Sequence, residues 1–171
     1  MILFGLFKNP FVLSEKKEKI SKRFITRLGK EVEPDVVFDA IGSKNMDDML
    51  KVLHVKTNPI DRHFLLLNIV ILSYKSREEK RMRELCRTIS EIHIKEFTDI
   101  APFLKEEMGG SLPHVPTFQH YATLLTEDGE FGKAIDVFNT AISFGLHDWT
   151  KADYAGRVER IKKKQEEHVN P

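Results

Sequence analysis

The sequence contains a single cysteine, Cys86, so it cannot form an internal disulfide bridge. A chain of 171 residues can bury a substantial apolar core, and it needs neither disulfides nor a structural metal to fold. One cysteine is also too few to build a zinc finger. The low cysteine content is typical of proteins in a reducing compartment, and we expect this protein in the cytoplasm.

An excess of charge of one sign and long apolar runs are lacking as well. The formal net charge is +1, which gives no global reason to expect binding to nucleic acid or to a membrane. The longest apolar stretch outside the N-terminus, residues 64–74, is interrupted by Asn68 and Ser73 and is far too short to cross a bilayer. The apolar start, residues 1–7, lacks the basic region of a secretion signal. We therefore expect no transmembrane segment.

Recognisable catalytic and metal-binding motifs are also missing. None of the seven histidines belongs to an H-E-x-x-H pair, and no phosphate-binding Gly-rich loop or G-x-S-x-G motif occurs. Cys86 lies on the apolar stripe of a predicted helix, which favours a buried and unreactive thiol. We therefore expect a non-catalytic protein without a metal or a cofactor.

Apolar residues recur with helical spacing through most of the chain, and no stretch alternates for long enough to predict a strand. Several helix starts are marked by caps: Asn45, Asn58 followed by Pro59, and a capping box from Ser76 to Glu79. The prediction is an all-α fold of eight or nine helices arranged as antiparallel hairpins. The expected helices cover residues 14–28, about 36–41, 45–55, 59–74, 76–94, about 98–108, 117–126, 130–144 and 148–167.

The domain organisation predicted from these patterns is simple. Residues 1–13 form an apolar N-terminal segment, which either packs on the core or is exposed as a hook for a partner or a membrane surface. Residues 14–171 form a single helical domain. Residues 109–116, with two glycines and two prolines, form the clearest loop and mark a candidate boundary within it. This loop is either a hinge or the edge of a groove.

The segment after this loop has a distinctive order of large and small residues. Alanines at positions 122, 134 and 141 are small enough to let two helices approach closely. Large residues fill the space around them, at positions Phe118, Tyr121, Leu125, Phe131 and Phe138. With Gly129 at the turn, this order resembles a tetratricopeptide repeat (TPR). Two positions depart from the family pattern: Phe118 replaces the usual tryptophan, and Leu146 stands near the position of the usual proline.

Small residues recur in the next predicted helix at Ala152, Ala155 and Gly156. A glycine inside a helix costs about 1 kcal/mol relative to alanine, so we expect Gly156 to pack closely against the helix of residues 130–144. The charged run 162–167 then suits a solvated capping helix. The earlier hairpin, residues 59–94, lacks the small residues of the repeat. The resemblance therefore predicts a TPR-like hairpin and capping helix at residues 117–167, within a short α-solenoid or a helical bundle.

The resemblance implies a scaffold that binds another protein or a peptide, because the first helices of successive TPR hairpins line a concave surface. By analogy, the ligand-facing residues of the 117–126 helix are Gln119, His120 and Thr123. The preceding hairpin contributes Arg62, Asn68 and Lys75 as further candidates. Asn68 lies within an apolar helix, so its amide must be hydrogen-bonded or line a cavity.

Two other hypotheses follow from the sequence. Residues 14–28 carry six positive and two negative side chains, and residues 77–87 are also rich in arginine. Two such basic helices predict binding to nucleic acid or to an anionic surface, provided that they form one continuous positive face. Alternatively, the chain is a structural protein that self-associates into a homo-oligomer through the apolar segment 1–13.

Overall fold

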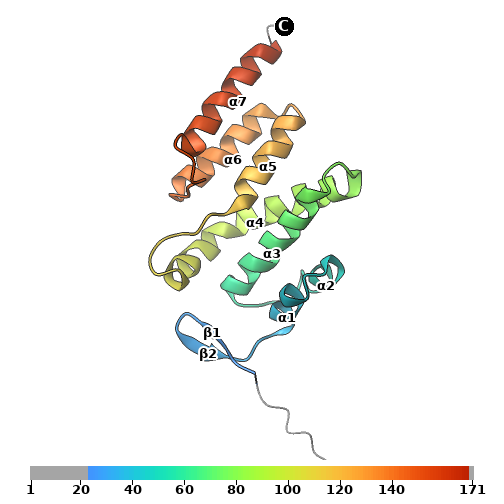
Figure 1. Cartoon of the computed structure of the whole chain (residues 1–171), viewed down its shortest axis with the longest axis vertical. Coiled ribbons are helices and arrows are strands. Elements are labelled where there is room, and N and C mark those ends of the chain that lie inside the picture. The colour runs from blue at the N-terminus through green and yellow to red at the C-terminus, as the bar shows by residue number, and fades with distance from the viewer. Residues whose placement is uncertain (1–22, 170–171) are drawn as a thin grey trace, which may run out of the picture.

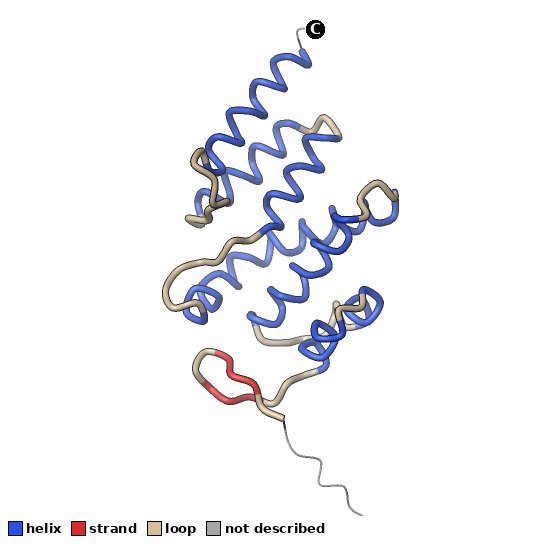
Figure 2. The backbone as a smooth tube through the Cα atoms, viewed as in Figure 1, coloured by secondary structure: helices blue, strands red, loops and turns tan. Residues whose placement is uncertain are grey.

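The computed structural model describes residues 23–169 of the chain as an elongated stack of helices (Figure 1). The predicted N-terminal segment, residues 1–13, and most of the predicted helix 14–28 lie outside the described residues. Figure 2 shows that helix dominates and that strand is confined to one small hairpin. The predicted all-helical character is therefore confirmed in its main feature, although the described residues form seven helices rather than eight or nine.

The small hairpin replaces the C-terminal part of the helix that we predicted at residues 14–28. Strands β1 (Ile25–Arg27) and β2 (Lys30–Val32) pair antiparallel, with Ile25 opposite Val32. Leu28 and Gly29 make the connecting turn, and both have positive φ angles, of 51° and 70°. A two-residue turn of this type matches the twist of paired strands. The strands have only three residues each, which is too short for an alternating pattern to be visible in the sequence.

Side chains of the helices hold this hairpin in place. Arg27 forms an ion pair with the buried carboxylate of Asp61, at 2.5 Å. The backbone N–H of Leu28 donates to Glu107 at 2.5 Å. Arg23, before β1, pairs with Asp39. These three contacts join the hairpin to residues of three helices that follow in the chain, so polar contacts to distant elements explain why residues 25–32 are not helical.

Two short helices follow, α1 (Val36–Ser43) and α2 (Met46–Lys51). Asp35 caps α1 by accepting from the N–H groups of Val37 and Phe38, at 3.0 and 2.9 Å. Asn45 caps α2 as predicted, although this helix ends at Lys51 instead of continuing to residue 55. Both helices cover one side of the next helix, α3 (Figure 1).

The central hairpin consists of α3 (Pro59–Lys75) and α4 (Lys80–Glu107). Asn58 caps α3 as predicted, accepting from the N–H of Asp61 at 2.9 Å. The predicted capping box at 76–79 is wrong. Ser76 ends α3, and the N–H of Glu79 donates to the carbonyl of Ser76 at 2.9 Å, so these residues form the turn between the two helices.

Helix α4 is a single helix of 28 residues, which corrects our prediction of two helices over the same range. Pro102 lies inside it and removes one backbone donor, the partner of the Thr98 carbonyl. Both Thr98 and Pro102 are exposed, so water can replace the missing hydrogen bond. The apolar side chains of Phe97, Ile100 and Leu104 are buried on the other side and hold the helix together across this point.

The C-terminal part contains α5 (Pro116–Glu127), α6 (Phe131–Ser143) and α7 (Asp153–Val169). Helices α5 and α6 form a second hairpin, and α7 packs against α6 (Figure 1). Ala122, Ala134 and Ala141 are all completely buried, as expected if they let the helices approach closely. Within the described residues, none of the helices combines the length and the apolar character that crossing a bilayer requires.

Two apolar clusters form the core, and α4 contributes to both. One cluster lies mainly between α1, α3 and the first half of α4, and it includes Cys86 and Ile89. The other joins the second half of α4 to α5, α6 and α7, and it includes Phe97 and Leu104.

A chain of polar side chains crosses the core between α3, α4 and α5. The Nδ1 atom of His63 lies 3.0 Å from Nε2 of His93, and Nδ1 of His93 lies 2.8 Å from the hydroxyl oxygen of Thr117. All three side chains are buried. Burial lowers the pKa of His63 to about 4, and burial together with the neighbouring His63 lowers the pKa of His93 well below its ordinary value. Both histidines are therefore neutral at pH 7.

We predict that this histidine pair makes the stability of the fold sensitive to acid. Because the unfolded chain binds protons on its histidines near pH 6.5 and the folded chain does not, stability is fully present above pH 6.5 and is lost as pH falls. For His63 alone, the free energy of unfolding should fall by roughly 2 kcal/mol between pH 7 and pH 5. Urea unfolding followed by circular dichroism at the two pH values measures this slope. The variant His63→Met should show a smaller slope, whereas His54→Gln, at an exposed position, should leave it unchanged. An equal slope in all three proteins would contradict the prediction.

We also correct the expected role of Gly156 in packing. A Cβ atom added to Gly156 would lie 2.4 Å from Cβ of Ala152, in the turn before α7, and not against α6. By contrast, a Cβ added to Gly132 in α6 would meet nothing within 4 Å. The glycine at position 156 is therefore required by the turn that starts α7.

This pair of helical glycines gives a matched prediction. Replacing Gly132 by alanine should stabilise the protein by up to about 1 kcal/mol, because alanine favours the helix. Gly156→Ala should instead destabilise it by about 1–3 kcal/mol, because the new methyl group forces the turn to move. Thermal unfolding measures both effects. The double variant Ala152→Gly with Gly156→Ala removes the clash and should recover most of the loss; failure to recover would refute this explanation.

Candidate functional site

A groove lies between α5 and α7. Its volume is about 310 Å³. Helix α6 lies beneath it and contributes Phe138 to its floor. The other lining residues come from α5 and α7: Ala122, Thr123, Thr126, Glu127, Arg157, Arg160, Ile161 and Lys164.

The floor of the groove is apolar and firmly packed. Ala122 is completely buried, and Phe138 and Ile161 are only 3% and 7% exposed. The ring of Phe138 packs against Tyr154 of α7, with their centroids 5.3 Å apart. Because the side chain of Ala122 is only a methyl group, α6 can approach α5 closely at this point. The floor can therefore contact the aliphatic parts of a bound chain.

One wall of the groove is positively charged. Arg157, Arg160 and Lys164 have spacings of three and four residues, which places them on one face of α7. Arg157 forms an ion pair with Asp148, at 2.5 Å. Arg160 and Lys164 form no ion pair or side-chain hydrogen bond with any other described residue. The groove therefore presents two exposed cations that have no direct acidic partner among the described residues.

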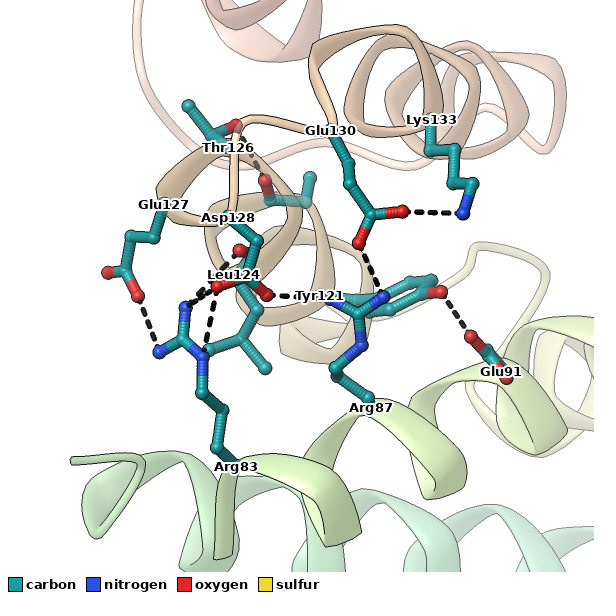
Figure 3. Close-up of polar contacts among 11 residues, drawn as sticks. Arg83, Arg87, Glu91, Tyr121, Leu124, Thr126, Glu127, Asp128, Glu130 and Lys133 are labelled. Atoms are coloured by element: carbon teal, nitrogen blue, oxygen red, sulfur yellow. Dashed lines mark hydrogen bonds and ion pairs between the residues drawn. The ribbon is translucent and has the colours of Figure 1, made fainter. Parts of the chain in front are cut away.

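The only acidic side chain that lines the groove, Glu127, is already neutralised from outside it. Arg83 of α4 contacts Glu127 at 2.9 Å, and Arg77 contacts it at 3.4 Å (Figure 3 shows the Arg83 contact). The same region of α4 also binds the turn between α5 and α6. Arg83 and Arg87 both contact Asp128, at 2.6 Å, and Arg87 also contacts Glu130 at 2.6 Å. We call these residues, Arg77, Arg83, Arg87, Glu127, Asp128 and Glu130, the arginine–acid cluster.

Further contacts support the cluster at its edges. Hydrogen bonds from Lys133 and Arg87 lower the pKa of Glu130, so it stays ionised. Tyr121 of α5 donates to Glu91 of α4 at 2.5 Å, and burial together with this acceptor raises the pKa of the tyrosine (Figure 3). The cluster thus holds the second hairpin against α4 at the end where α5 passes into α6.

This geometry bears on the predicted basic surface at residues 77–87. Three of its arginines, Arg77, Arg83 and Arg87, are paired with acids of the neighbouring hairpin. Arg27, from the other predicted basic helix, is paired with Asp61. In the described part of the chain, arginines from both predicted basic regions are therefore paired with acids, which reduces the positive charge that they offer to an anionic surface.

Of the six residues proposed from the sequence, only Thr123 lines the groove. Its hydroxyl donates to the carbonyl of Gln119, which is half-buried and lies outside the groove. His120 stacks on Tyr74 of α3, with ring centroids 3.9 Å apart. Burial, chiefly, lowers the pKa of His120 to about 4, and the nearby charges of His114 and Arg77 act in the same direction.

The other three candidates lie on α3, away from the groove. Arg62 forms an ion pair with Glu96 at 2.7 Å and donates to the carbonyl of Leu53 at 2.5 Å. Asn68 donates to the carbonyl of Phe64 at 2.7 Å, which confirms that its amide is hydrogen-bonded. Lys75 is exposed at the end of the helix. The structure therefore does not bring the six residues together at one site.

Sequence reasoning missed the groove residues of α7. Arg157, Arg160, Ile161 and Lys164 follow the i, i+3, i+4, i+7 pattern of a single helical face, so the signal was present. Residues 162–167 were predicted to form a solvated capping helix, because the other wall of the groove, on α5, is distant in the sequence.

Cys86 is buried, and burial raises the pKa of its thiol, which makes it a poor nucleophile. Residues 23–169 contain no cluster of three histidine, cysteine, aspartate or glutamate side chains placed to hold a metal ion.

Comparisons with known proteins give one distant relative. A protein of Aquifex aeolicus (strain VF5), described only as uncharacterized, is 24% identical over 91 residues. The match covers 51% of this chain and 41% of the relative, so the chain spans about two fifths of that protein. No protein-family model matches, and no solved structure matches.

We predict that Arg83 contributes to the docking of the second hairpin. Replacing it by glutamine removes contacts to Glu127 and Asp128. Because these groups are partly exposed, the free energy of unfolding should fall by only about 1 kcal/mol, and by less at high salt. Denaturant unfolding at low and high salt measures the loss. The control is Lys95→Gln at an exposed position of the same helix, and a loss no larger than that of the control would contradict this role.

Proposed function

We propose that this protein is a non-catalytic protein-binding module, and that the groove between α5 and α7 holds an acidic segment of another protein. The observation that carries the proposal is the pair of unpaired cations, Arg160 and Lys164, above an apolar floor. The groove's own acid, Glu127, is paired with Arg83 of α4 and with Arg77 of the turn before α4, so it does not compete for these cations.

The chemistry of the groove favours a polypeptide over a small molecule. Its two cations belong to one helix and lie four residues apart, about 6 Å along the axis. That distance matches two successive side chains on the same side of an extended chain. Carboxylates at these positions would pair with the cations, while their backbone and aliphatic atoms would lie on Phe138 and Ile161.

The tetratricopeptide resemblance supports the same location. In that family the first helices of successive hairpins line the ligand-binding surface, and α5 and α7 hold the equivalent positions in the proposed assignment. A cytoplasmic adaptor or scaffold of this type needs no disulfide and no cofactor, in keeping with the single buried thiol of Cys86.

The proposal can be tested with synthetic peptides and isothermal titration calorimetry. We expect a peptide rich in aspartate and glutamate to bind, and the same peptide with asparagine and glutamine not to bind. The double variant Arg160→Glu with Lys164→Glu should weaken binding of the acidic peptide at least tenfold, because attraction becomes repulsion. Higher salt should weaken the binding of the wild-type protein.

A matched control separates the groove from the overall charge of α7. The double variant Lys162→Glu with Lys163→Glu makes the same change in charge on exposed residues that do not line the groove. It should bind the acidic peptide with nearly unchanged affinity. Equal weakening by both double variants, or tighter binding of a single-stranded oligonucleotide than of the acidic peptide, would sink the proposal in favour of nonspecific anion binding.

A further inference from the structure

The turn between α6 and α7 presents the only tryptophan of the chain to solvent. Trp149 is 78% exposed, more than any other large apolar side chain in the described residues. Its backbone has a φ angle of 64°, in the left-handed region that bulky residues rarely adopt. Neither the exposure nor the backbone conformation favours folding. Strain of this kind persists only where surrounding contacts enforce it, and it is concentrated at functional sites.

The contacts that enforce the turn are well defined. The carboxylate of Asp148 is buried and accepts from the N–H and the hydroxyl of Thr150, at 2.8 and 2.7 Å. Asp153 accepts from the N–H groups of Asp148 and Tyr154, both at 2.8 Å. These hydrogen bonds fix the backbone on either side of Trp149. The exposed indole therefore projects from a rigid turn.

The turn is directly coupled to the groove. Arg157 lines the groove, and its Nε atom donates to Asp148, the neighbour of Trp149, at 2.5 Å. The groove cations from Arg157 to Lys164 span about 10 Å of α7, and the helix begins about 6 Å before Arg157, at Asp153. The turn therefore lies just beyond one end of the groove.

We infer that the acidic segment held in the groove also carries a large apolar side chain, which packs against Trp149. This inference rests on the proposed function and adds a specificity to it. An extended chain advances about 3.4 Å per residue, so the apolar side chain should lie roughly three to five residues from the acids that contact Arg160 and Lys164. The direction of the bound chain is not fixed by these distances, so the apolar residue can precede or follow the acids.

The rigidity of the turn favours a peptide over a lipid surface as the partner. A bilayer accepts an indole in many orientations, so a strained and rigid turn would not increase the affinity for a membrane. A side chain of defined position benefits from a tryptophan that is already held in place, because less conformational freedom is lost on binding. Exposed tryptophans of this type are also frequent anchors of protein interfaces.

The test uses two pairs of synthetic peptides without tryptophan. Each peptide has three acidic residues, a flexible spacer of three residues and a terminal phenylalanine or alanine. One pair has the acidic residues first, and the other pair has them last. By calorimetry, the phenylalanine peptide should bind wild-type protein about 5- to 10-fold more tightly than the alanine peptide. In Trp149→Asn this ratio should fall to about 1. Asparagine tolerates the left-handed backbone, so the turn should be kept.

Two further measurements make the result specific. Because Trp149 is the only tryptophan, its fluorescence should shift to shorter wavelength with the phenylalanine peptide and not with the alanine peptide. Val36→Ala changes an exposed apolar residue on α1, at the other end of the stack, and should keep the wild-type ratio (Figure 1). Trp149→Phe should keep most of the preference for the phenylalanine peptide.

The outcomes distinguish this inference from the proposed function. If both peptides bind equally to wild-type protein, or if Trp149→Asn keeps the ratio, the role of Trp149 is refuted and the acidic groove stands. If a vesicle of anionic phospholipid shifts the fluorescence and the phenylalanine peptide does not, the turn contacts membranes and the inference is overturned. If neither peptide binds wild-type protein, the proposed function and this inference fail together.

Discussion

The continuity of α4 is the constraint on which the arrangement of the described helices depends. Its first half packs with α3 in one apolar cluster, through Cys86 and Ile89, and its second half packs with α5 and α6 in the other, through Phe97 and Leu104. Helix α4 passes from one cluster to the other between Ile92 and Phe97, and a break there would remove the rigid connection that this helix makes between them. Because α4 is one helix through this region, the second hairpin has a fixed position on the first, and α7 in turn has a fixed position on α6.

Charge then determines what the second hairpin can present. The arginine–acid cluster fixes the α5–α6 turn to α4. Its arginines also form ion pairs with the carboxylate of Glu127. Partly exposed ion pairs contribute little to stability individually. Their larger effect here is on the groove, which keeps the cations of α7 and loses its competing carboxylate. The same contacts that position α5 therefore shape the electrostatic character of the proposed binding surface.

Local signals allowed much of the fold to be predicted from the sequence. Asn45 and Asn58 mark helix starts because their side chains serve the nearby backbone, and Ala122, Ala134 and Ala141 mark close packing because of their size. Features that depend on distant partners were missed. The β-hairpin is held by Asp61 and Glu107, far along the chain, and the arginines of α4 were interpreted as a free surface because their acids lie over 40 residues away. The groove could not be predicted from local sequence patterns for the same reason, because its walls come from two helices that are not consecutive.

The buried thiol has a practical consequence. Cys86 is the only cysteine of the chain, it is fully buried in the cluster beneath α3, and its pKa is raised by burial. Maleimide and other thiol reagents should therefore leave the native protein unmodified. Two cysteines introduced at the rim of the groove, one on α5 and one on α7, could then be labelled selectively with spin probes or fluorophores without first altering the core, so that distances between α5 and α7 become measurable in solution.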